Sequence, residues 1–234
     1  MDRPIGIIGA MPEEVAGLCE HMESVETIDL ANMLFFRGKL EGHDAVVVQS
    51  GVGKVNAAVC AQLLAGHFRA ACVINTGIAG SLMNKLEIGD IVISTDAVQH
   101  DVDATVWGYA PGEVPGMGTA FYDADEDLIR LAETVCAKAD PAIRSHRGRI
   151  ASGDQFIADA EAKRRIIETF RAACTEMEGA AIAQVCHRSG TPFVILRAIS
   201  DKADGSAVAD NNEFTEEVIR TNDRIVRGML AAMT

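Results

Sequence analysis

The chain has 234 residues, 48% of them hydrophobic and 24% charged, and its formal net charge is −13. A chain of this length can bury a sizeable core, and we expect a single domain over residues 1–234. The acidity disfavours nucleic acid as a partner, because phosphate backbones repel a negative protein, and it favours a small substrate that is not strongly anionic. No apolar run reaches the ~20 residues of a membrane span, and the short glycine-rich start is not typical of a signal peptide, so we expect a cytoplasmic protein with no membrane partner.

Short apolar runs, separated by glycine and polar turns, predict the strands. In chain order the expected strands are Ile5–Ala10, Leu34–Leu40, Ala45–Gln49, Cys72–Thr76, Asp90–Val98, Arg149–Ser152 and Phe193–Ile199. Helical patterns lie between them, at Pro12–Met22, Val55–His67, Glu126–Ala139, Ala160–Phe170, Met177–Ser189 and Asn212–Met233. Continuous apolar runs suit strands that are buried on both faces, and their alternation with helices predicts a three-layer α/β/α domain. The segment Trp107–Thr119 is rich in glycine and proline and predicts a long ordered loop, a feature that is often functional.

Three glycine-rich turns follow predicted strands, at residues 6–14, 50–54 and 75–81. The first lacks the third glycine of a dinucleotide-binding fingerprint, and the second has only part of the spacing of a phosphate-binding loop. Glu13 and Glu14 suit the start of a helix electrostatically, but they would not suit a bound phosphate. Because open α/β sheets bind ligands at the carboxyl ends of their strands, the three turns predict one shared cleft.

Charged residues also stand at the ends of later predicted elements. Glu176 and Glu178 flank a methionine just before a helix of small residues. Glu178 can act as an acceptor for ribose hydroxyls, or it can simply be an acid that is favourable at the start of a helix. Arg197 and Asp201 end an apolar strand, and since burying either one alone is costly, each needs an ion-pair partner or a functional role.

Neither the cysteines nor the histidines predict a metal site. The six cysteines are scattered, which is typical of buried, reduced thiols in a cytosolic protein. In a strand, the run His100-Asp101-Val102-Asp103 would place the histidine and the two aspartates on opposite faces, which separates the possible ligands.

Seven sequence blocks together resemble the 5′-methylthioadenosine/S-adenosylhomocysteine nucleosidases, a family within the nucleoside phosphorylase superfamily. The blocks are IGIIGAMPEEV, SGVGKVNAA, INTGIAGSL, GDIVIST, SGDQFI, TEMEGAAIAQVC and RAISDKAD, and they follow the order of the family. The resemblance implies a single α/β domain with a mixed, partly barrel-like central sheet between helices. It also implies a homodimer that needs no cofactor, acting in methionine salvage.

The resemblance assigns roles to five residues around the reacting bond. Glu14, in MPEEV, corresponds to the carboxylate that positions and activates water, and Asp201, in RAISD, to the acid that protonates adenine at N7 and holds its amino group. Glu178, in EMEG, corresponds to the acceptor for the ribose 3′-hydroxyl, with Met177 packing on the sugar. Arg197 corresponds to an arginine near the ribose end of the site.

Further residues correspond to the walls of the substrate pocket. Phe156 corresponds to the aromatic residue that stacks on adenine, and Ile157 to a backbone contact with the edge of the base. Met11 and Val52 correspond to part of the pocket for the 5′ substituent.

The resemblance also gives the long loop a role. Residues 100–115 correspond to a segment that reaches into the site of the partner subunit. Trp107 and Pro115 lie in this segment, and Trp107 is the only tryptophan of the chain. Tryptophan is enriched as an anchor at buried interfaces, so we expect Trp107 or Pro115 to line the neighbour's 5′ pocket across a two-fold axis.

The chain departs from the family pattern at two places. Ile78 stands where many members have a serine that orients the catalytic aspartate, so Asp201 must be held by another group, such as a backbone amide or a water. In the loop expected after Asp204, residues 208–212 read VADNN where many members have a phenylalanine that covers the 5′ group. Relatives that act on 6-amino-6-deoxyfutalosine share an apolar residue at the position of Ile78 and a similar VQHDVD segment, which makes that nucleoside an alternative substrate.

The expected reaction is hydrolysis of the N-glycosidic bond of 5′-substituted adenine nucleosides: 5′-methylthioadenosine, S-adenosylhomocysteine and 5′-deoxyadenosine. Such a bond breaks through an oxocarbenium-like state, which needs an acid for the leaving base and a carboxylate for the water. A phosphorylase would need cations to hold phosphate, and the turn Pro12-Glu13-Glu14 offers none. A non-catalytic purine-binding domain would have no use for Glu14, although the fold alone does not decide this point.

Overall fold

The computed structural model describes residues 3–139, 143–204 and 207–233, with side chains left out for 207–215. The strands in this part of the chain are β1 (Ile5–Gly9), β2 (Glu23–Leu30), β3 (Met33–Leu40), β4 (His43–Gln49), β5 (Cys72–Ser81), β6 (Ile91–Gln99), β7 (Tyr122–Asp123), β8 (Ser145–Ser152), β9 (Cys174–Glu176) and β10 (Phe193–Asp201). The helices are α1 (Pro12–Glu20), α2 (Lys54–Gln62), α3 (Glu126–Ala139), α4 (Ala160–Phe170), α5 (Gly179–Ser189) and α6 (Ala207–Ala232), with a π-helical turn η1 (Leu63–His67) and a 3₁₀ turn η2 (Thr105–Trp107).

All the strands belong to one mixed sheet that is partly closed into a barrel. The order is β10-β6-β8-β9-β5-β1-β4-β3-β2, and β5 also pairs with β10, so that β5, β9, β8, β6 and β10 form a closed ring. The strands β1, β4, β3 and β2 extend the sheet outward from β5. The predicted α/β class and the partly barrel-like sheet are therefore confirmed.

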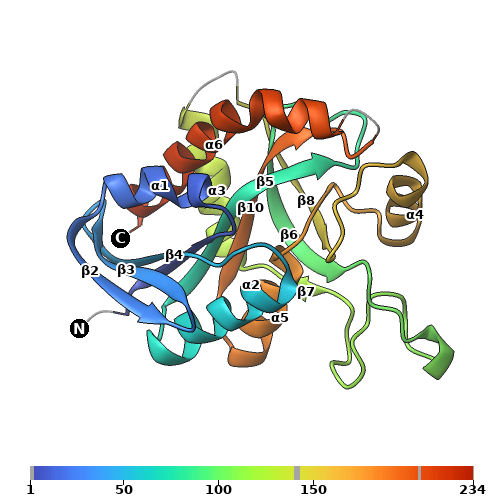
Figure 1. Ribbon diagram of the computed structural model, residues 1–234, viewed down its shortest axis with the longest axis horizontal. Coiled ribbons are helices and arrows are strands. Elements are labelled where there is room, and N and C mark those ends of the chain that lie inside the picture. Colours follow the sequence, from blue (N-terminus) through green and yellow to red (C-terminus); the bar gives the residue numbers. More distant parts are fainter. Residues whose placement is uncertain (1–2, 140–142, 205–206, 234) are drawn as a thin grey trace.

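Helices cover the sheet on both sides, which confirms the three layers. Figure 1 shows α1, α3 and α6 on one side and α2 and α5 on the other. The run of valines in β4 illustrates why the sequence is apolar on both faces. Val47 belongs to the core cluster beneath α1 and α6, whereas Val46 and Val48 belong to the cluster beneath α2 and α5. Successive side chains of a strand point to opposite faces, so a doubly covered strand needs an uninterrupted apolar run.

Three short or exposed strands were not expected from the sequence. β2 has no apolar run because most of its residues are exposed, and it pairs only with β3 at the edge of the sheet. The two are joined at Ala31 and Asn32, which both adopt left-handed conformations with φ of 54° and 62°, as in the tight turns that match strand twist. β7 and β9 have two and three residues, too few to show a periodic pattern.

Two expectations about local structure were wrong. β6 ends at Gln99, so the side-chain alternation assumed for residues 100–103 does not apply. Helix α6 begins at Ala207 and includes residues 208–212, where a loop was expected. The side chains of these residues, and with them the question of what covers the 5′ group, lie outside the described residues.

The predicted long loop is present. The segment after η2 runs to β7 as a long loop that projects from the body of the molecule (Figure 1). The six cysteines are free thiols, and all except Cys19 are buried. Of the described helices, none has the length and apolar character to span a bilayer.

Candidate active site

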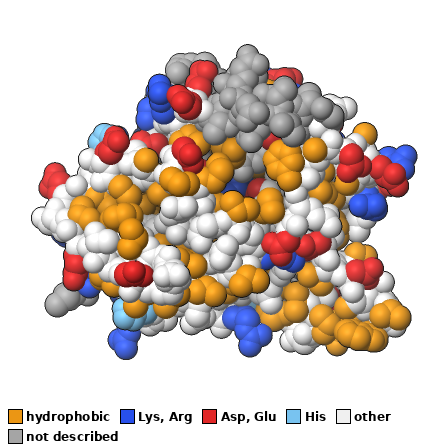
Figure 2. Space-filling model, in the orientation of Figure 1, with side chains coloured by type: hydrophobic (Ala, Val, Ile, Leu, Met, Phe, Trp, Pro, Cys, Tyr) orange, Lys and Arg blue, Asp and Glu red, His pale blue; other side chains and the backbone are white. Residues whose placement is uncertain are grey.

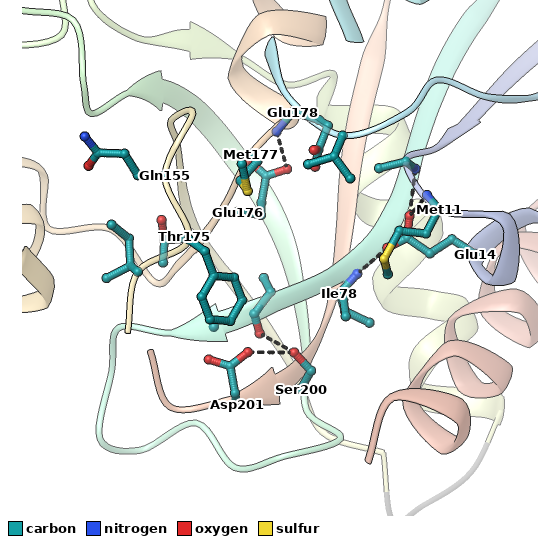
Figure 3. A pocket seen from close by; sticks show the side chains of 16 residues that line it. Met11, Glu14, Ile78, Gln155, Thr175, Glu176, Met177, Glu178, Ser200 and Asp201 are labelled. Carbon is teal, nitrogen blue, oxygen red and sulfur yellow. Dashed lines mark hydrogen bonds between the residues drawn. The ribbon is translucent and has the colours of Figure 1, made fainter. Parts of the chain in front are cut away.

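One cavity lies where the carboxyl ends of β1, β5, β9 and β10 come together, as the three glycine-rich turns predicted (Figure 3). Its walls are formed by Ala10, Met11, Glu14, Val52, Ile78, Ala79, Gly80, Gln155, Phe156, Ile157, Thr175, Glu176, Met177, Glu178, Ser200 and Asp201. These include nine of the twelve residues expected at the site. The other three, Arg197, Trp107 and Pro115, do not line the cavity.

Glu14 lies in the first turn of α1, and backbone N–H groups just before that helix and in β5 hold its carboxylate. Its Oε2 accepts hydrogen bonds from the backbone N–H groups of Ala10 (2.7 Å) and Met11 (3.0 Å). Its Oε1 accepts one from the N–H of Ile78 in β5 (3.1 Å). Burial raises the pKa of Glu14, and the nearby Arg197 together with the three backbone donors opposes that rise. The hydrogen bonds thus fix the position of the carboxylate, while burial and the surrounding groups act on its pKa in opposite directions.

Asp201 ends β10 and lies across the cavity from Glu14. Its Oδ2 accepts a hydrogen bond from the hydroxyl of Ser200 (2.8 Å), and its Oδ1 accepts one from the N–H of Ala203 (2.8 Å). A Cβ atom on Gly80 would lie 2.7 Å from Oδ1, so only glycine leaves room for this carboxylate. A backbone amide or a water was expected to hold Asp201 in place of the family serine at Ile78; the structure shows the amide of Ala203 and, in addition, the hydroxyl of Ser200.

Arg197 does not line the cavity but lies behind its wall, next to Glu176 and Glu178, and its place near the ribose end stays a prediction. The side chain is 1% exposed and donates hydrogen bonds to Glu176, through both Nε and Nη2, and to Asn75 Oδ1 (2.7 Å). Its Nη2 is 3.9 Å from Glu178 Oε2, and its charge also acts on Glu14. One buried cation therefore lies close to three carboxyl groups.

Glu176 is a cavity residue that the sequence analysis left without a role. Besides Arg197, its carboxylate accepts hydrogen bonds from the Ser152 hydroxyl and from the N–H groups of Glu178 (3.2 Å) and Gly179 (2.8 Å). Burial alone would raise its pKa, but Arg197 and these donors lower the pKa of Glu176 below its usual value. The sequence did point to Glu176 as a candidate site residue, because Glu176 and Glu178 are the two acids of the EME block.

Glu178 precedes α5 and is nearly buried. Its Oε1 accepts a hydrogen bond from the N–H of Gly53 (2.8 Å), in the turn that carries Val52 to the mouth of the cavity. Burial and the adjacent charge of Glu176 raise the pKa of Glu178 to about 7. This carboxylate can therefore accept or donate a hydrogen bond near neutral pH.

The rim of the cavity is apolar. Phe156 and Val52 are half exposed, at 53% and 50%, whereas Ile157 is buried behind them. Figure 2 shows hydrophobic side chains around a central hollow in this face of the molecule. Such a rim suits a flat, uncharged ring rather than an anion.

Trp107 and Pro115 lie on the projecting loop and are exposed, Trp107 to 74%. Figure 2 shows hydrophobic side chains gathered at the end of the molecule where this loop projects. A role for these residues in the site of a partner subunit stays a prediction.

Comparison with known proteins gives a consistent result. Residues 4–231 match the phosphorylase superfamily. The 5′-methylthioadenosine/S-adenosylhomocysteine nucleosidase of Geobacillus kaustophilus is 46% identical over 97% of this chain and 96% of its own. The enzyme of that name from Neisseria meningitidis, solved with methylthio-immucillin-A, has a TM-score of 0.95 and 39% identity, covering 99% of this chain and 100% of its own. A futalosine hydrolase mutant from Helicobacter pylori has a TM-score of 0.94 and 33% identity, covering 99% and 100%. The chain belongs to the 5′-methylthioadenosine/S-adenosylhomocysteine nucleosidase family of the phosphorylase superfamily.

Proposed function

We propose that this chain hydrolyses the N-glycosidic bond of 5′-substituted adenine nucleosides, releasing adenine and the 5′-substituted ribose. The observation that carries the proposal is a pair of buried carboxylates, Glu14 at the start of helix α1 and Asp201 at the end of strand β10, that reach one cavity (Figure 3). The nucleosidase names of the relatives support the same reaction.

In the proposed mechanism, Asp201 delivers a proton to N7 of adenine as the C1′–N9 bond breaks and its electron pair moves into the base. Glu14 orients a water molecule, whose oxygen forms the new bond to C1′ while Glu14 takes its proton. General acid and general base steps each typically contribute about 10²–10⁴ in rate. The reaction needs no further group for these proton transfers.

The floor of the cavity suits the charge that develops on the sugar. The ribose becomes positively charged as the bond breaks, and the carboxylates of Glu14, Glu176 and Glu178 outnumber the single Arg197 beneath them. Fixed groups of opposite charge stabilise a developing cation most strongly when they are in place beforehand. We assign the ribose 3′-hydroxyl to Glu178, with Met177 against the sugar.

The apolar rim supplies the remaining contacts. Phe156 stacks on adenine, and the backbone of Ile157 meets the edge of the base. Met11 and Val52 form part of the pocket for the 5′ substituent, and Ile78 packs between the two carboxylates. All of these side chains line the cavity.

We also propose that the protein is a cytoplasmic homodimer of single-domain subunits that acts in methionine salvage. Val55 and Val59 are exposed to 74% and 39% along α2, and Trp107 is exposed on the loop. Large exposed apolar side chains of this kind suit an interface. In the dimer, Trp107 or Pro115 would complete the 5′ pocket of the neighbouring subunit.

A second candidate substrate is 6-amino-6-deoxyfutalosine. It is favoured by the similarity to the Helicobacter pylori futalosine hydrolase and by the apolar Ile78 in the cavity wall. Both candidates break the same type of bond, so the difference lies in the 5′ group.

The proposal is tested with purified protein in phosphate-free buffer that contains a chelator. Adenine release is measured from 5′-methylthioadenosine, S-adenosylhomocysteine, 5′-deoxyadenosine and 6-amino-6-deoxyfutalosine, with Glu14→Gln as the control for contaminating activity. We expect phosphate-independent release from the first three. A strict requirement for phosphate would show a phosphorylase, and preference for the fourth substrate would establish the alternative.

A further inference from the structure

The side chain of Asn222, on α6, contacts the part of β5 that lies beside the cavity. It is 2% exposed, and its Nδ2 donates hydrogen bonds to Thr76 Oγ1 (2.8 Å) and to the carbonyl of Gly77 (3.0 Å). The carbonyl of Leu196 lies farther away, at 3.5 Å. An amide nitrogen carries two hydrogens, so the two shorter contacts use both.

The carbonyl of Gly77 belongs to the same peptide group as the N–H of Ile78. That N–H donates the hydrogen bond to Glu14 Oε1 at 3.1 Å. A peptide group is planar, so the direction of its carbonyl fixes the direction of its N–H. Asn222 and Glu14 therefore hold the two ends of one rigid unit.

The residue that precedes this peptide group is a glycine, which has no side chain to restrict the backbone. A Cβ atom on residue 77 would lie 2.6 Å from Arg197 Nη1 and 2.6 Å from Glu14 Oε1, so the position requires glycine. Glycine is the residue whose backbone has the most freedom to rotate. Pairing with β10, in which Gly77 and Ile78 are in register with Arg197 and Ala198, holds this segment, and Asn222 adds a side-chain donor at the carbonyl of Gly77.

We infer that Asn222 is a positioning residue for Glu14, acting through the Gly77–Ile78 peptide. The inference rests on the proposed function, in which Glu14 orients and deprotonates the attacking water. A donor on the carbonyl also polarises the peptide and strengthens its N–H as a donor to the carboxylate. The N–H of Ile78 is one of the contacts that oppose the rise of the Glu14 pKa on burial, so its loss raises that pKa further.

The test compares Asn222→Ala with Thr76→Val, which removes the other hydrogen bond of the same amide and leaves the one to Gly77. For Asn222→Ala we expect kcat to fall about tenfold with KM within about twofold, because a small displacement of a reacting group costs rate rather than binding. The acid limb of the pH profile of kcat/KM should move to higher pH, because Glu14 must be ionised to accept a proton. Thr76→Val should keep both kcat and the pH profile near those of the parent protein.

Thermal unfolding of each variant identifies effects that are merely structural. If Asn222→Ala does not accumulate in folded form, Asn222→Leu keeps the same number and branching of side-chain heavy atoms and also lacks the donor. Equal losses of kcat in the Asn222 and Thr76 variants, or an unchanged acid limb, would overturn the inference. Glu14→Gln distinguishes failure of the proposed function from failure of the inference. If Glu14→Gln remains active, the proposed role of Glu14 is wrong. If Glu14→Gln is inactive while Asn222→Ala behaves like the parent protein, only the role of Asn222 is wrong.

Discussion

Replacing Gly77 with alanine should inactivate the protein while leaving it folded. The new methyl group would lie 2.6 Å from Arg197 Nη1 and 2.6 Å from Glu14 Oε1, whereas ordinary contacts begin at 3.4 Å. One or both groups must therefore move by about 0.8 Å. A misplacement of about 1 Å at a reacting group can cost about 10²-fold in rate, so we expect kcat to fall by that order.

The assay is adenine release from 5′-methylthioadenosine at saturating substrate, together with a thermal unfolding curve. Gly77 does not line the cavity, so KM should change little. Gly38→Ala is the matched control, because its Cβ would lie 2.5 Å from the carbonyl of Glu23 in the β2–β3 edge, away from the cavity. This control should lose stability and keep its kcat. Folded Gly77→Ala protein with kcat within about threefold of the parent would refute the argument.

Three further predictions concern the carboxylates and the loop. Glu14→Gln and Asp201→Asn should each lower kcat by about 10² or more without unfolding the protein, and near-normal turnover in either variant would remove that residue from the mechanism. Burial and the charge of Glu176 raise the pKa of Glu178 from 4.5 to about 7, so the folded state retains a proton that the unfolded state loses. The contribution of Glu178 to the free energy of unfolding is therefore lost as pH rises from 4.5 to 7, a decrease of about 3 kcal/mol. Glu178→Gln should flatten that part of the pH–stability curve in urea denaturation, and equal slopes in the two proteins would contradict the assignment. Trp107→Ala should weaken the dimer in sedimentation and raise KM for 5′-substituted substrates, and a fully active monomer at assay concentration would contradict the role of the loop.

The core of the fold was predictable because burial on both faces leaves a clear pattern. β1, β4 and β10 each contain an uninterrupted run without polar side chains, IGIIG, AVVV and FVIL, and the structure buries all five residues of β1 and all nine of β10. β2 was missed because its exposed residues are selected for solvent rather than for a core, and β9 because three residues cannot show a period. The closure of the barrel depends on pairing between β5 and β10, which are more than a hundred residues apart, and no local pattern reports it.

Some residues of the candidate site could be predicted because a charged side chain at the end of a buried strand needs a partner or a function. Contacts between side chains from different elements were harder to predict. Asp201 ends a buried strand, so its need for a partner or a function was visible in the sequence, whereas Glu14 also suits a helix start and its proposed role came from the family resemblance. The ion pair between Arg197 and Glu176 could not be predicted, because it depends on how β9 and β10 are placed relative to each other along the strand direction. An ion-pair partner for Arg197 was one expectation from the sequence, but the residue that forms the pair was not identified.

The hydrogen bonds to Glu14 have a consequence for how this site can change. All three donors are main-chain N–H groups, of residues 10, 11 and 78, which every amino acid except proline supplies. The side chains of Met11 and Ile78 meanwhile form the wall of the cavity. Under the proposed function, the main-chain atoms of these two residues support catalysis and their side chains contribute to selectivity. A lineage, or a saturation library, can exchange the side chains and explore new nucleosides while inheriting an intact catalytic carboxylate.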